Sequence, residues 1–304
     1  MVDYSSMQAE LRELARQKNA IVIAHNYQRP EVQDAADVTG DSLELSRTAA
    51  ATDAGIILFC GVHFMAETAH ILSPDKKVLI AEERAGCPMA DMITAEDVRR
   101  LKAEHPGALV VAYVNTSAAV KAETDVCCTS ANAAAVVANI PADKEIIFIP
   151  DRNLALYAEK QTGRRLIKWQ GFCPTHEYIT AEVIAAAKRE HPQAVVLAHP
   201  ECLPEVQAMA DALRSTSGMI RYAKESPARE FIVATEMGLN HRLRKENPGK
   251  RFYSPTKKAI CPNMKMTTLA KAIQTLREER YEIRLPEDVR LKALAAVEAM
   301  VRYA

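Results

Sequence analysis

The sequence of 304 residues contains no Cys-x-x-Cys pair, although it has seven cysteines. This absence argues against zinc ribbons and ferredoxin-type cluster loops, both of which use closely spaced cysteines. The cysteine count is odd and we expect a reducing compartment, so a disulfide framework is not expected either. Any metal site must therefore gather cysteines that are distant in the sequence.

An excess of either charge is also absent, because 39 Lys and Arg residues balance 39 Asp and Glu residues. Without a basic patch or a charged tail, nucleic acid is not an expected partner, and a small molecule is the better expectation. Long hydrophobic runs are missing as well: the run 56–60 is far too short to span a membrane. The first residues lack the basic and apolar regions of a signal peptide, so we expect a soluble, cytoplasmic protein.

What the sequence does contain is a threefold repeat. Three short apolar runs each end in alanine and are followed by a polar residue, with spacings of 88 and 86 residues: His25, Tyr113 and His199. A hydroxyl residue lies seventeen positions after each of these: Ser42, Ser130 and Thr216. Three Cys-Pro pairs follow with spacings of 86 and 88, at 87–88, 173–174 and 261–262. A fixed period of this kind indicates a repeated structural unit.

The repeated unit predicts an α/β fold. Short buried-strand runs alternate with amphipathic, Ala-rich stretches, and leading helices are expected over 6–18, 94–104 and 180–190. We therefore expect three parallel-sheet αβα units related by pseudo-threefold symmetry, with the active site at their common interface. The expected units are 1–92, 93–178 and 179–266, and we expect the tail 267–304 to pack back on the first unit.

Polar side chains recur at the end of the first strand of each unit. Residues two apart in a strand point the same way, which selects three pairs: His25 with Tyr27, Tyr113 with Asn115, and His199 with Glu201. Ligands of parallel α/β sheets bind beyond the carboxyl ends of the strands. Three related units would aim all six side chains at one cavity, and the set contains both proton donors and proton acceptors.

The repeated hydroxyls Ser42, Ser130 and Thr216 follow turn-like stretches, and each is expected to open a helix. Serine and threonine are ordinary N-caps, so a purely capping role is one interpretation. The N-terminus of a helix also attracts anions, so a site for phosphate or carboxylates is the other.

The repeated cysteines Cys87, Cys173 and Cys261 would meet near the same axis. Three thiolates without a fourth suit a [4Fe–4S] cluster that keeps one iron open to substrate. All-sulfur ligation favours iron–sulfur or zinc over magnesium or calcium. The other four cysteines do not recur at matched positions and are expected to be buried bystanders.

These residues resemble a known family, the quinolinate synthases, nearly from end to end. The matching segments are Ala24-His25-Asn26-Tyr27-Gln28, Gly40-Asp41-Ser42, Tyr113-Val114-Asn115, Thr129-Ser130-Ala131-Asn132, His199-Pro200-Glu201-Cys202 and Ser215-Thr216. The resemblance implies condensation of iminoaspartate with dihydroxyacetone phosphate to quinolinate, phosphate and water, in NAD biosynthesis. It also implies a [4Fe–4S] cluster on Cys87, Cys173 and Cys261, with an open iron acting as a Lewis acid, and a fold of three α/β domains.

Family active-site positions fall on ten residues here. They are His25, Tyr27, Ser42, Tyr113, Asn115, Ser130, His176, His199, Glu201 and Thr216. The resemblance implies that Glu201 and Tyr27 move protons, assisted by the three histidines, and that the hydroxyls hold phosphate or carboxylates. His176 follows a ligand in Cys173-Pro174-Thr175-His176, which would place it beside the cluster. The segment Cys261-Pro262-Asn263-Met264 lacks the extra cysteines of some members, so no local redox disulfide is expected.

Two other functions remain open at the level of sequence. A diphthamide-type radical enzyme has a similar three-unit plan, with one cluster cysteine in each unit, but acts on a protein and S-adenosylmethionine. A zinc-binding structural module would use the cysteines without catalysis. For the preferred function, the expected partners are the two small substrates and, as the one candidate protein, the enzyme that produces iminoaspartate.

Overall fold

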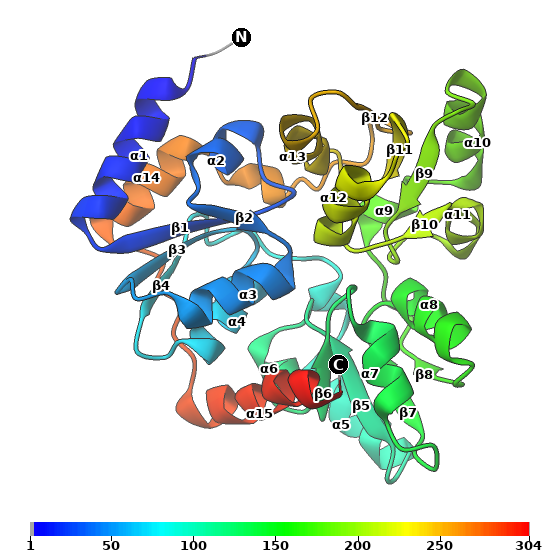
Figure 1. Ribbon diagram of the computed structural model, residues 1–304. Helices are drawn as coiled ribbons and strands as arrows, with labels where there is room; N and C mark the ends of the chain where they lie inside the picture. The colour runs from blue at the N-terminus through cyan, green and yellow to red at the C-terminus, as the bar shows by residue number, and fades with distance from the viewer. Residues whose placement is uncertain (1–2, 304) are drawn as a thin grey trace.

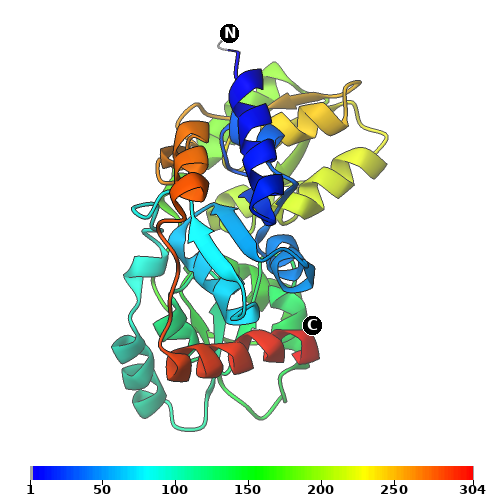
Figure 2. The ribbon, with the colours of Figure 1, turned by 90° about the vertical axis from the view of Figure 1, so that its left-hand side faces the viewer.

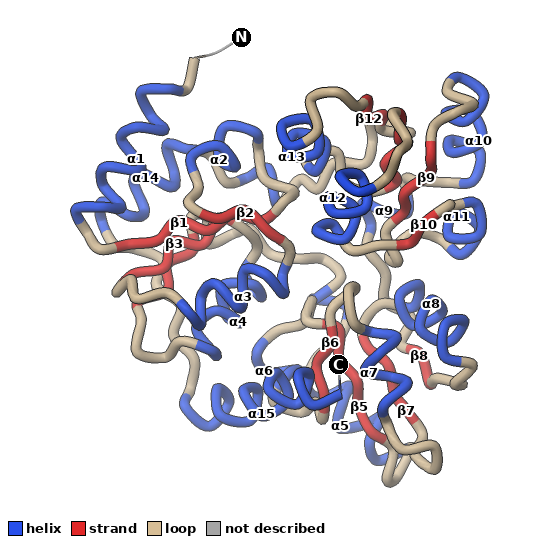
Figure 3. Tube along the Cα trace, viewed as in Figure 1, coloured by secondary structure: helices blue, strands red, loops and turns tan. Residues whose placement is uncertain are grey.

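A computed structural model describes residues 3–303, and the side chains of residues 3–300. The chain forms three separate four-stranded sheets, each flanked by helices, and the three units surround a common centre (Figures 1 and 3). The first sheet contains β1 (Ala20–His25), β2 (Val38–Gly40), β3 (Ile56–Cys60) and β4 (Lys77–Ile80). The second contains β5 (Leu109–Tyr113), β6 (Val126–Cys128), β7 (Ile146–Ile149) and β8 (Ile167–Lys168). The third contains β9 (Val195–Ala198), β10 (Ala212–Leu213), β11 (Glu230–Ala234) and β12 (Arg251–Tyr253).

All three sheets are parallel and share one strand order. The orders are β2-β1-β3-β4, β6-β5-β7-β8 and β10-β9-β11-β12. The register of the two central strands also repeats, with Ala24 opposite Cys60, Ala112 opposite Ile149, and Ala198 opposite Ala234. The predicted fold class, an α/β protein of three repeated parallel-sheet units, is confirmed.

Helices cover both faces of each sheet. One face carries the leading helix and a short helix: α1 (Ser5–Gln17) with α2 (Pro30–Ala35), α5 (Ala95–Glu104) with α6 (Ala118–Lys121), and α10 (Ala181–Glu190) with α11 (Pro204–Met209). The other carries α3 (Ser42–Ala51) and α4 (His63–Leu72), α7 (Ala133–Asn139) and α8 (Arg152–Thr162), or α12 (Thr216–Glu225) and α13 (Leu239–Glu246). Three short helices lie outside this scheme: α9 (Pro174–Glu177), η1 (Ala90–Met92) and η2 (Met264–Met266).

The leading helices agree with the predicted ranges to within one or two residues, and Thr94 shows why. Its side chain accepts a hydrogen bond from the backbone N–H of Asp97, and the Asp97 side chain bonds back to the backbone of Thr94, which closes a capping box. At the other end, His105 leaves helical geometry just before Pro106, because a residue before proline avoids the α conformation.

The first two units share one hydrophobic core. It combines residues of α3 and α4 with residues of α7 and α8 and with the last helix, α15 (Glu287–Tyr303). The third unit packs around two clusters of its own, one on each face of its sheet. Burial of apolar side chains therefore stabilises the interface between the first and second units more than the interfaces that the third unit makes with them.

The C-terminal tail differs in part from the prediction that 267–304 packs on the first unit. Helix α14 (Leu269–Glu278) does lie beside α1, as Figure 2 shows. Helix α15 instead packs mainly on β6 and α6 of the second unit, with a smaller contact to α4. The edge strand β6 is fully buried, and the apolar face of α15 supplies the cover for it. Residue 304 lies outside the described residues.

Among the helices within residues 3–303, none is long and apolar enough to cross a lipid bilayer.

Candidate active site

A central pocket lies where the carboxyl ends of the three sheets meet. Every site residue predicted from the sequence lines it: His25, Tyr27, Ser42, Cys87, Tyr113, Asn115, Ser130, Cys173, His176, His199, Glu201, Thr216 and Cys261. The strand-end residues reach it because β1, β5 and β9 occupy equivalent places in the three sheets and each ends beside the pocket. Apolar side chains complete the wall, including Val62, Met89 and Met264.

Two histidines are held in one orientation by the same local bond. The backbone N–H of Tyr27 donates to Nδ1 of His25 at 3.1 Å, and the backbone N–H of Glu201 donates to Nδ1 of His199 at 3.2 Å. A ring nitrogen that accepts a hydrogen bond carries no proton, so the proton of each neutral ring resides on Nε2. Burial lowers the pKa of His25 to about 3 and that of His199 to about 4, which keeps both rings neutral. Both are therefore hydrogen-bond donors through Nε2, and His199 Nε2 lies 3.2 Å from Ser130 Oγ.

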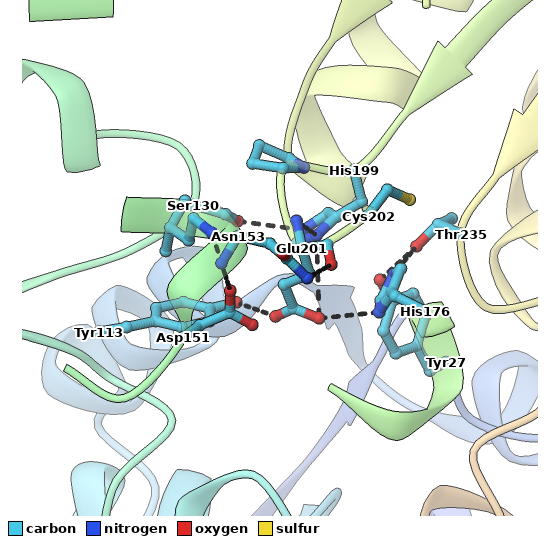
Figure 4. Close-up of polar contacts among 12 residues, drawn as sticks. Tyr27, Tyr113, Ser130, Asp151, Asn153, His176, His199, Glu201, Cys202 and Thr235 are labelled. Atoms are coloured by element: carbon cyan, nitrogen blue, oxygen red, sulfur yellow. Dashed lines mark hydrogen bonds and ion pairs between the residues drawn. The ribbon is translucent and has the colours of Figure 1, made fainter. Parts of the chain in front are cut away.

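Glu201 is the charged centre of the pocket (Figure 4). The Tyr113 hydroxyl donates to its Oε1 at 2.7 Å, while its Oε2 lies 2.9 Å from His176 Nδ1 and 3.9 Å from His199 Nδ1. Burial opposes ionisation of this carboxyl, but His176 and the hydrogen bonds from His176 and Tyr113 outweigh it and lower its pKa. Glu201 is therefore a buried carboxylate with 4% of its surface exposed.

A hydroxyl that the sequence analysis did not select extends this arrangement. Thr235 Oγ1 lies 2.9 Å from His176 Nε2 and 2.6 Å from the Tyr27 hydroxyl. A chain of polar contacts thus runs from Tyr27 through Thr235 and His176 to Glu201 and Tyr113, in which hydrogen bonds form every link except the ion-pair contact between His176 and Glu201 (Figure 4). Thr235 directly follows β11, the second central strand of the third sheet, so the carboxyl end of that strand was the signal that could have identified it.

Two buried carboxyl groups near the pocket were also missed. They occupy matched places, two residues beyond β7 and β11: Asp151 and Glu236. Glu236 forms an ion pair with Lys265 at 2.8 Å, and burial raises the pKa of Glu236. Asp151 accepts hydrogen bonds from the backbone N–H groups of Asn153 and Leu154 at the start of α8. Burial, followed by the nearby charge of Glu201, raises the pKa of Asp151, which favours its neutral form.

The repeated hydroxyls occupy two kinds of position. Ser42 and Thr216 are the first residues of α3 and α12, but the capping side chains are those of the preceding residues, Asp41 and Ser215. The prediction that each hydroxyl opens a helix is wrong for Ser130, because a turn closed by Asn132 intervenes and α7 begins only at Ala133. Helix capping therefore does not account for any of the three hydroxyls, and all three face the pocket.

The three repeated cysteines are half-buried. Nearby backbone N–H groups act to lower the pKa of each thiol: those of residues 89 and 90 at Cys87, that of residue 176 at Cys173, and those of residues 263 and 264 at Cys261. Burial raises the pKa of all three thiols, to about 12 for Cys87, and the other two thiols add to the effect at Cys173. Convergent sulfur donors with N–H groups directed at them fit an iron–sulfur cluster, whose properties depend on such bonds.

A second potential ligand group overlaps with the cysteines. Ligand atoms of Cys173, His176 and Glu201 all lie within 4.8 Å of one another. This geometry also suits one metal ion of the zinc type, so the ligand set has to be tested directly. The other four cysteines are fully buried among apolar side chains: Cys60, Cys127, Cys128 and Cys202.

Comparisons with known proteins agree with this geometry. The family model described as "Quinolinate synthetase A protein" matches residues 9–302. The chain belongs to the quinolinate synthetase A family. A quinolinate synthase of Desulforudis audaxviator is 54% identical, over 96% of this chain and 97% of that protein. Those of Geobacter metallireducens and Methanoregula boonei are 51% and 52% identical, over at least 97% of both chains in each comparison.

The resemblance to quinolinate synthase is confirmed by this family assignment, and the chain is an enzyme. Membership of the quinolinate synthetase A family decides against a diphthamide-type radical enzyme and against a non-catalytic zinc module.

Proposed function

We propose that this enzyme condenses iminoaspartate with dihydroxyacetone phosphate to give quinolinate, phosphate and water. The observation that carries the proposal is the environment of Glu201, a buried carboxylate hydrogen-bonded to His176 and Tyr113 in a pocket that three thiols also line. Enolisation and dehydration both require a positioned proton carrier that exchanges protons in a site shielded from water. The relatives from Desulforudis audaxviator and Geobacter metallireducens are named quinolinate synthases, which supports quinolinate as the product.

Proton movement is assigned to Glu201 and Tyr27. The lowered pKa of Glu201 keeps it ionised at neutral pH, so it has a free site for a proton, and the chain through Thr235 connects it with the Tyr27 hydroxyl. Burial, followed by the charge of Glu201, raises the pKa of Tyr27, so its hydroxyl retains a proton that it can donate. The histidines His25 and His199 donate hydrogen bonds through Nε2 to substrate oxygens.

Substrate anions are assigned to the hydroxyls. Ser42 and Thr216 lie at the first turns of two ten-residue helices, where free N–H groups and the helix dipole favour negative charge. Ser130 is placed next to His199, and Tyr113 and Asn115 complete the binding set. Asn115 Oδ1 is buried and has no hydrogen-bond partner among the described residues, as expected of an atom reserved for substrate.

The cofactor is assigned to Cys87, Cys173 and Cys261, which would hold a [4Fe–4S] cluster. When bound, such a cluster supplies Lewis-acid polarisation of a substrate nitrogen or carboxylate at its open iron. The reducing conditions that these thiols require agree with a cytoplasmic location. As the source of one substrate, the iminoaspartate-producing enzyme is the candidate partner.

Anaerobic purification followed by metal analysis and turnover of both substrates tests the proposal. We expect iron and sulfide in the wild type, their loss in Cys87→Ala, and their retention in the control Cys60→Ala, which removes a buried thiol outside the pocket. Glu201→Gln should keep the cluster and lose roughly 10²–10⁴-fold in turnover. Zinc in place of iron, unaffected by Cys87→Ala, would instead assign one ion to Cys173, His176 and Glu201 and contradict the cluster.

A further inference from the structure

Three buried polar side chains, one in each unit, lie behind the active-site loops without lining the pocket. Each occurs eight residues after the first strand-end residue of its unit, in the short helix α2, α6 or α11: Gln33, Lys121 and Gln207. Their exposed fractions are 6%, 0% and 5%. The Oε1 atoms of Gln33 and Gln207 have no hydrogen-bond partner among the described residues, so the donor groups make the contacts that these side chains have. Buried donors are normally hydrogen-bonded, and their acceptors show what each side chain holds.

Gln33 holds the loop that follows β1. Its Nε2 donates to the carbonyl oxygens of Asn26 at 3.1 Å and Gln28 at 2.9 Å. These two carbonyls flank Tyr27 and lie one and three residues beyond His25. The amide thus fixes the backbone from which both pocket side chains of the first unit project.

Gln207 makes the same bonds in the third unit. Its Nε2 donates to the carbonyl oxygens of Pro200 at 2.8 Å and Cys202 at 2.9 Å. These again lie one and three residues beyond the strand-end residue, His199, and flank Glu201. The two glutamines are therefore equivalent in position and in partners.

Lys121 replaces the glutamine in the second unit without changing the partners. Its Nζ donates to the carbonyl oxygen of Val114 at 2.8 Å and to that of Thr116. These carbonyls flank Asn115 at the same one-residue and three-residue offsets from Tyr113. The side chain is fully buried and has no carboxylate bonded to it among the described residues, so the two carbonyls are its main compensation.

Each of the three side chains also reaches into a neighbouring unit. The carbonyl oxygen of Gly238 lies 3.0 Å from Gln33 Nε2, and that of Asn153 lies 3.2 Å from Gln207 Nε2, so in each case the two N–H groups of the amide are shared among three carbonyl oxygens. Lys121 Nζ lies 5.5 Å from the centre of the Phe64 ring. These partners are equivalent to one another, because each lies four residues after the strand residue opposite Ala24, Ala112 or Ala198.

The direction of these contacts is cyclic. The first unit reaches the third, the third reaches the second, and the second reaches the first, across the seams between α2 and α13, α11 and α8, and α6 and α4 (Figure 1). The partner group at each of these interfaces suits the side chain that contacts it. Gln33 and Gln207 each meet a carbonyl oxygen, which accepts from an amide. Lys121 meets the face of an aromatic ring, which binds an ammonium group better than an amide.

Gly238 shows that this approach is close. A Cβ atom at this position would lie 2.9 Å from the carbonyl oxygen of Tyr27 and 2.7 Å from both Glu236 Oε2 and Lys265 Nζ. Only glycine leaves space for the loop of the first unit at this seam.

We infer that Gln33, Lys121 and Gln207 are three equivalent positioning residues, each of which fixes one active-site loop and joins it to the next unit. The assignment of a kinetic effect to each loop rests on the proposed function. Lys121 positions the substrate-binding side chains of Tyr113 and Asn115, whereas Gln207 positions the proton carrier Glu201. The loops after β1, β5 and β9 are thus oriented by the same set of contacts from a buried side chain behind them, rather than by residues that line the pocket.

Replacing each side chain by methionine tests this inference, because methionine fills a similar volume without a donor. We expect Lys121→Met to raise KM at least about tenfold with a smaller change in kcat, and Gln207→Met to lower kcat at least about tenfold with a smaller change in KM. Hydrogen exchange should accelerate at the amides of 114–116 in Lys121→Met and at those of Glu201 and Cys202 in Gln207→Met, with the other two loops unchanged.

Lys121→Gln serves as the rescue, since it installs the amide that the other two units use. It should restore slow exchange at 114–116 and most of the activity, while exchange near Phe64 stays faster because the ring contact is lost. Gln8→Met is the matched control: Gln8 Nε2 donates to the carbonyl of Glu31 at 3.0 Å on the outer side of the first unit, so kinetics and loop exchange should not change.

Unchanged loop exchange in folded Lys121→Met and Gln207→Met would overturn the inference. So would a loss of activity and of exchange protection that is the same in all three loops and follows the melting temperature alone. If the methionine variants do not fold, loss of protection at 114–116 in folded Lys121→Gln overturns it, and retained protection supports it. A wild type without condensation activity would refute the proposed function, while the exchange measurements would still decide the role of these three residues.

Discussion

At the scale of single residues, the pocket is organised by side chains that the protein keeps in one protonation state each. His25 and His199 are neutral because they are buried, and their Nδ1 atoms are occupied by backbone N–H groups. Glu201 is ionised because the nearby His176, together with the hydrogen bonds from His176 and Tyr113, outweighs the effect of burial on its pKa. A proton can therefore move to or from Glu201 without changing the charge of the flanking imidazoles of His25 and His199.

Thr235→Val should lower kcat while leaving the cluster intact. The change removes the hydroxyl that joins Tyr27 to His176, and a buried partner left unsatisfied costs about 1–3 kcal/mol. This corresponds to a fall in kcat of roughly tenfold to a hundredfold, and Thr235→Ser should restore it. Thr275→Val is the matched control, since Thr275 is equally buried and bonds the carbonyl of Ala81 away from the pocket. Equal losses of kcat in both variants would show that Thr235 has only a structural role.

Acid should destabilise the fold through His25 and His199. Their folded-state pKa values of about 3 and about 4 lie below the unfolded value of about 6.5. As the pH falls through that interval, the unfolded state takes up protons that the folded state does not, so this stability is full above about pH 6.5, decreases within the interval, and has been lost once the pH is below the folded-state values. Urea midpoints at about pH 7 and about pH 5 measure this decrease, which should be smaller in His199→Gln. An identical decrease in His199→Gln would contradict the assignment.

At the scale of elements, helix N-termini separate two functions that adjacent residues perform. In α3 and α12 the residue before the helix makes the capping bond, and the first helical residue presents its hydroxyl to the pocket. Sequence alone could not assign these roles, because aspartate and serine at neighbouring positions are both competent caps. The capping geometry resolved this between Asp41 and Ser42, and between Ser215 and Thr216.

This separation predicts opposite outcomes for two serine substitutions. Ser42→Ala should raise the apparent KM about tenfold to a hundredfold, because a hydrogen bond to a charged group contributes about 1.5–3 kcal/mol, and should leave melting nearly unchanged. Ser215→Ala should lower stability by about 1 kcal/mol through loss of the cap, with little effect on KM. Both parameters should be measured on both proteins. A lower melting temperature with unchanged KM in Ser42→Ala would exclude an anion site there.

At the scale of the whole molecule, the three units are joined in different ways. The first two share an apolar core that α15 completes, whereas the first and third are joined by polar contacts such as Arg242 with Asn26 at 2.9 Å and Ser217 with Glu44 at 2.5 Å. Helix α15 is therefore a structural element of both the first and the second unit, although it is the last in sequence.

Ala296→Asp tests the contribution of α15. Ala296 is buried in the core shared with β6, and an unpaired buried charge there should destabilise the fold by about 3 kcal/mol or more. The control Ala295→Asp introduces the same group at the adjacent, exposed position and should have a small effect. Thermal melting of both proteins measures the difference. Comparable melting temperatures would mean that α15 is dispensable for the core.

The sequence by itself determined the repeat and the α/β class, and the candidate site residues selected from it all line the pocket, although Glu236 was not among them. The spacing of apolar residues and the polar residues at strand ends are local properties of the sequence, so the three copies of the pattern could be aligned from the sequence alone. The same reasoning missed β2, β6 and β10, short strands that lead directly into the turn-like stretches before Ser42, Ser130 and Thr216. The predicted boundaries of the three units stay predictions.

Only the tertiary structure decided which residues meet across the seams. Thr235 joins Tyr27, Lys121 meets Phe64, and α15 covers β6, in each case over a separation that no local pattern encodes. Such contacts depend on how whole sheets are placed relative to one another, and that placement is set by burial summed over many side chains. The sequence therefore specifies the parts of the active site, and the packing of three units specifies their orientation.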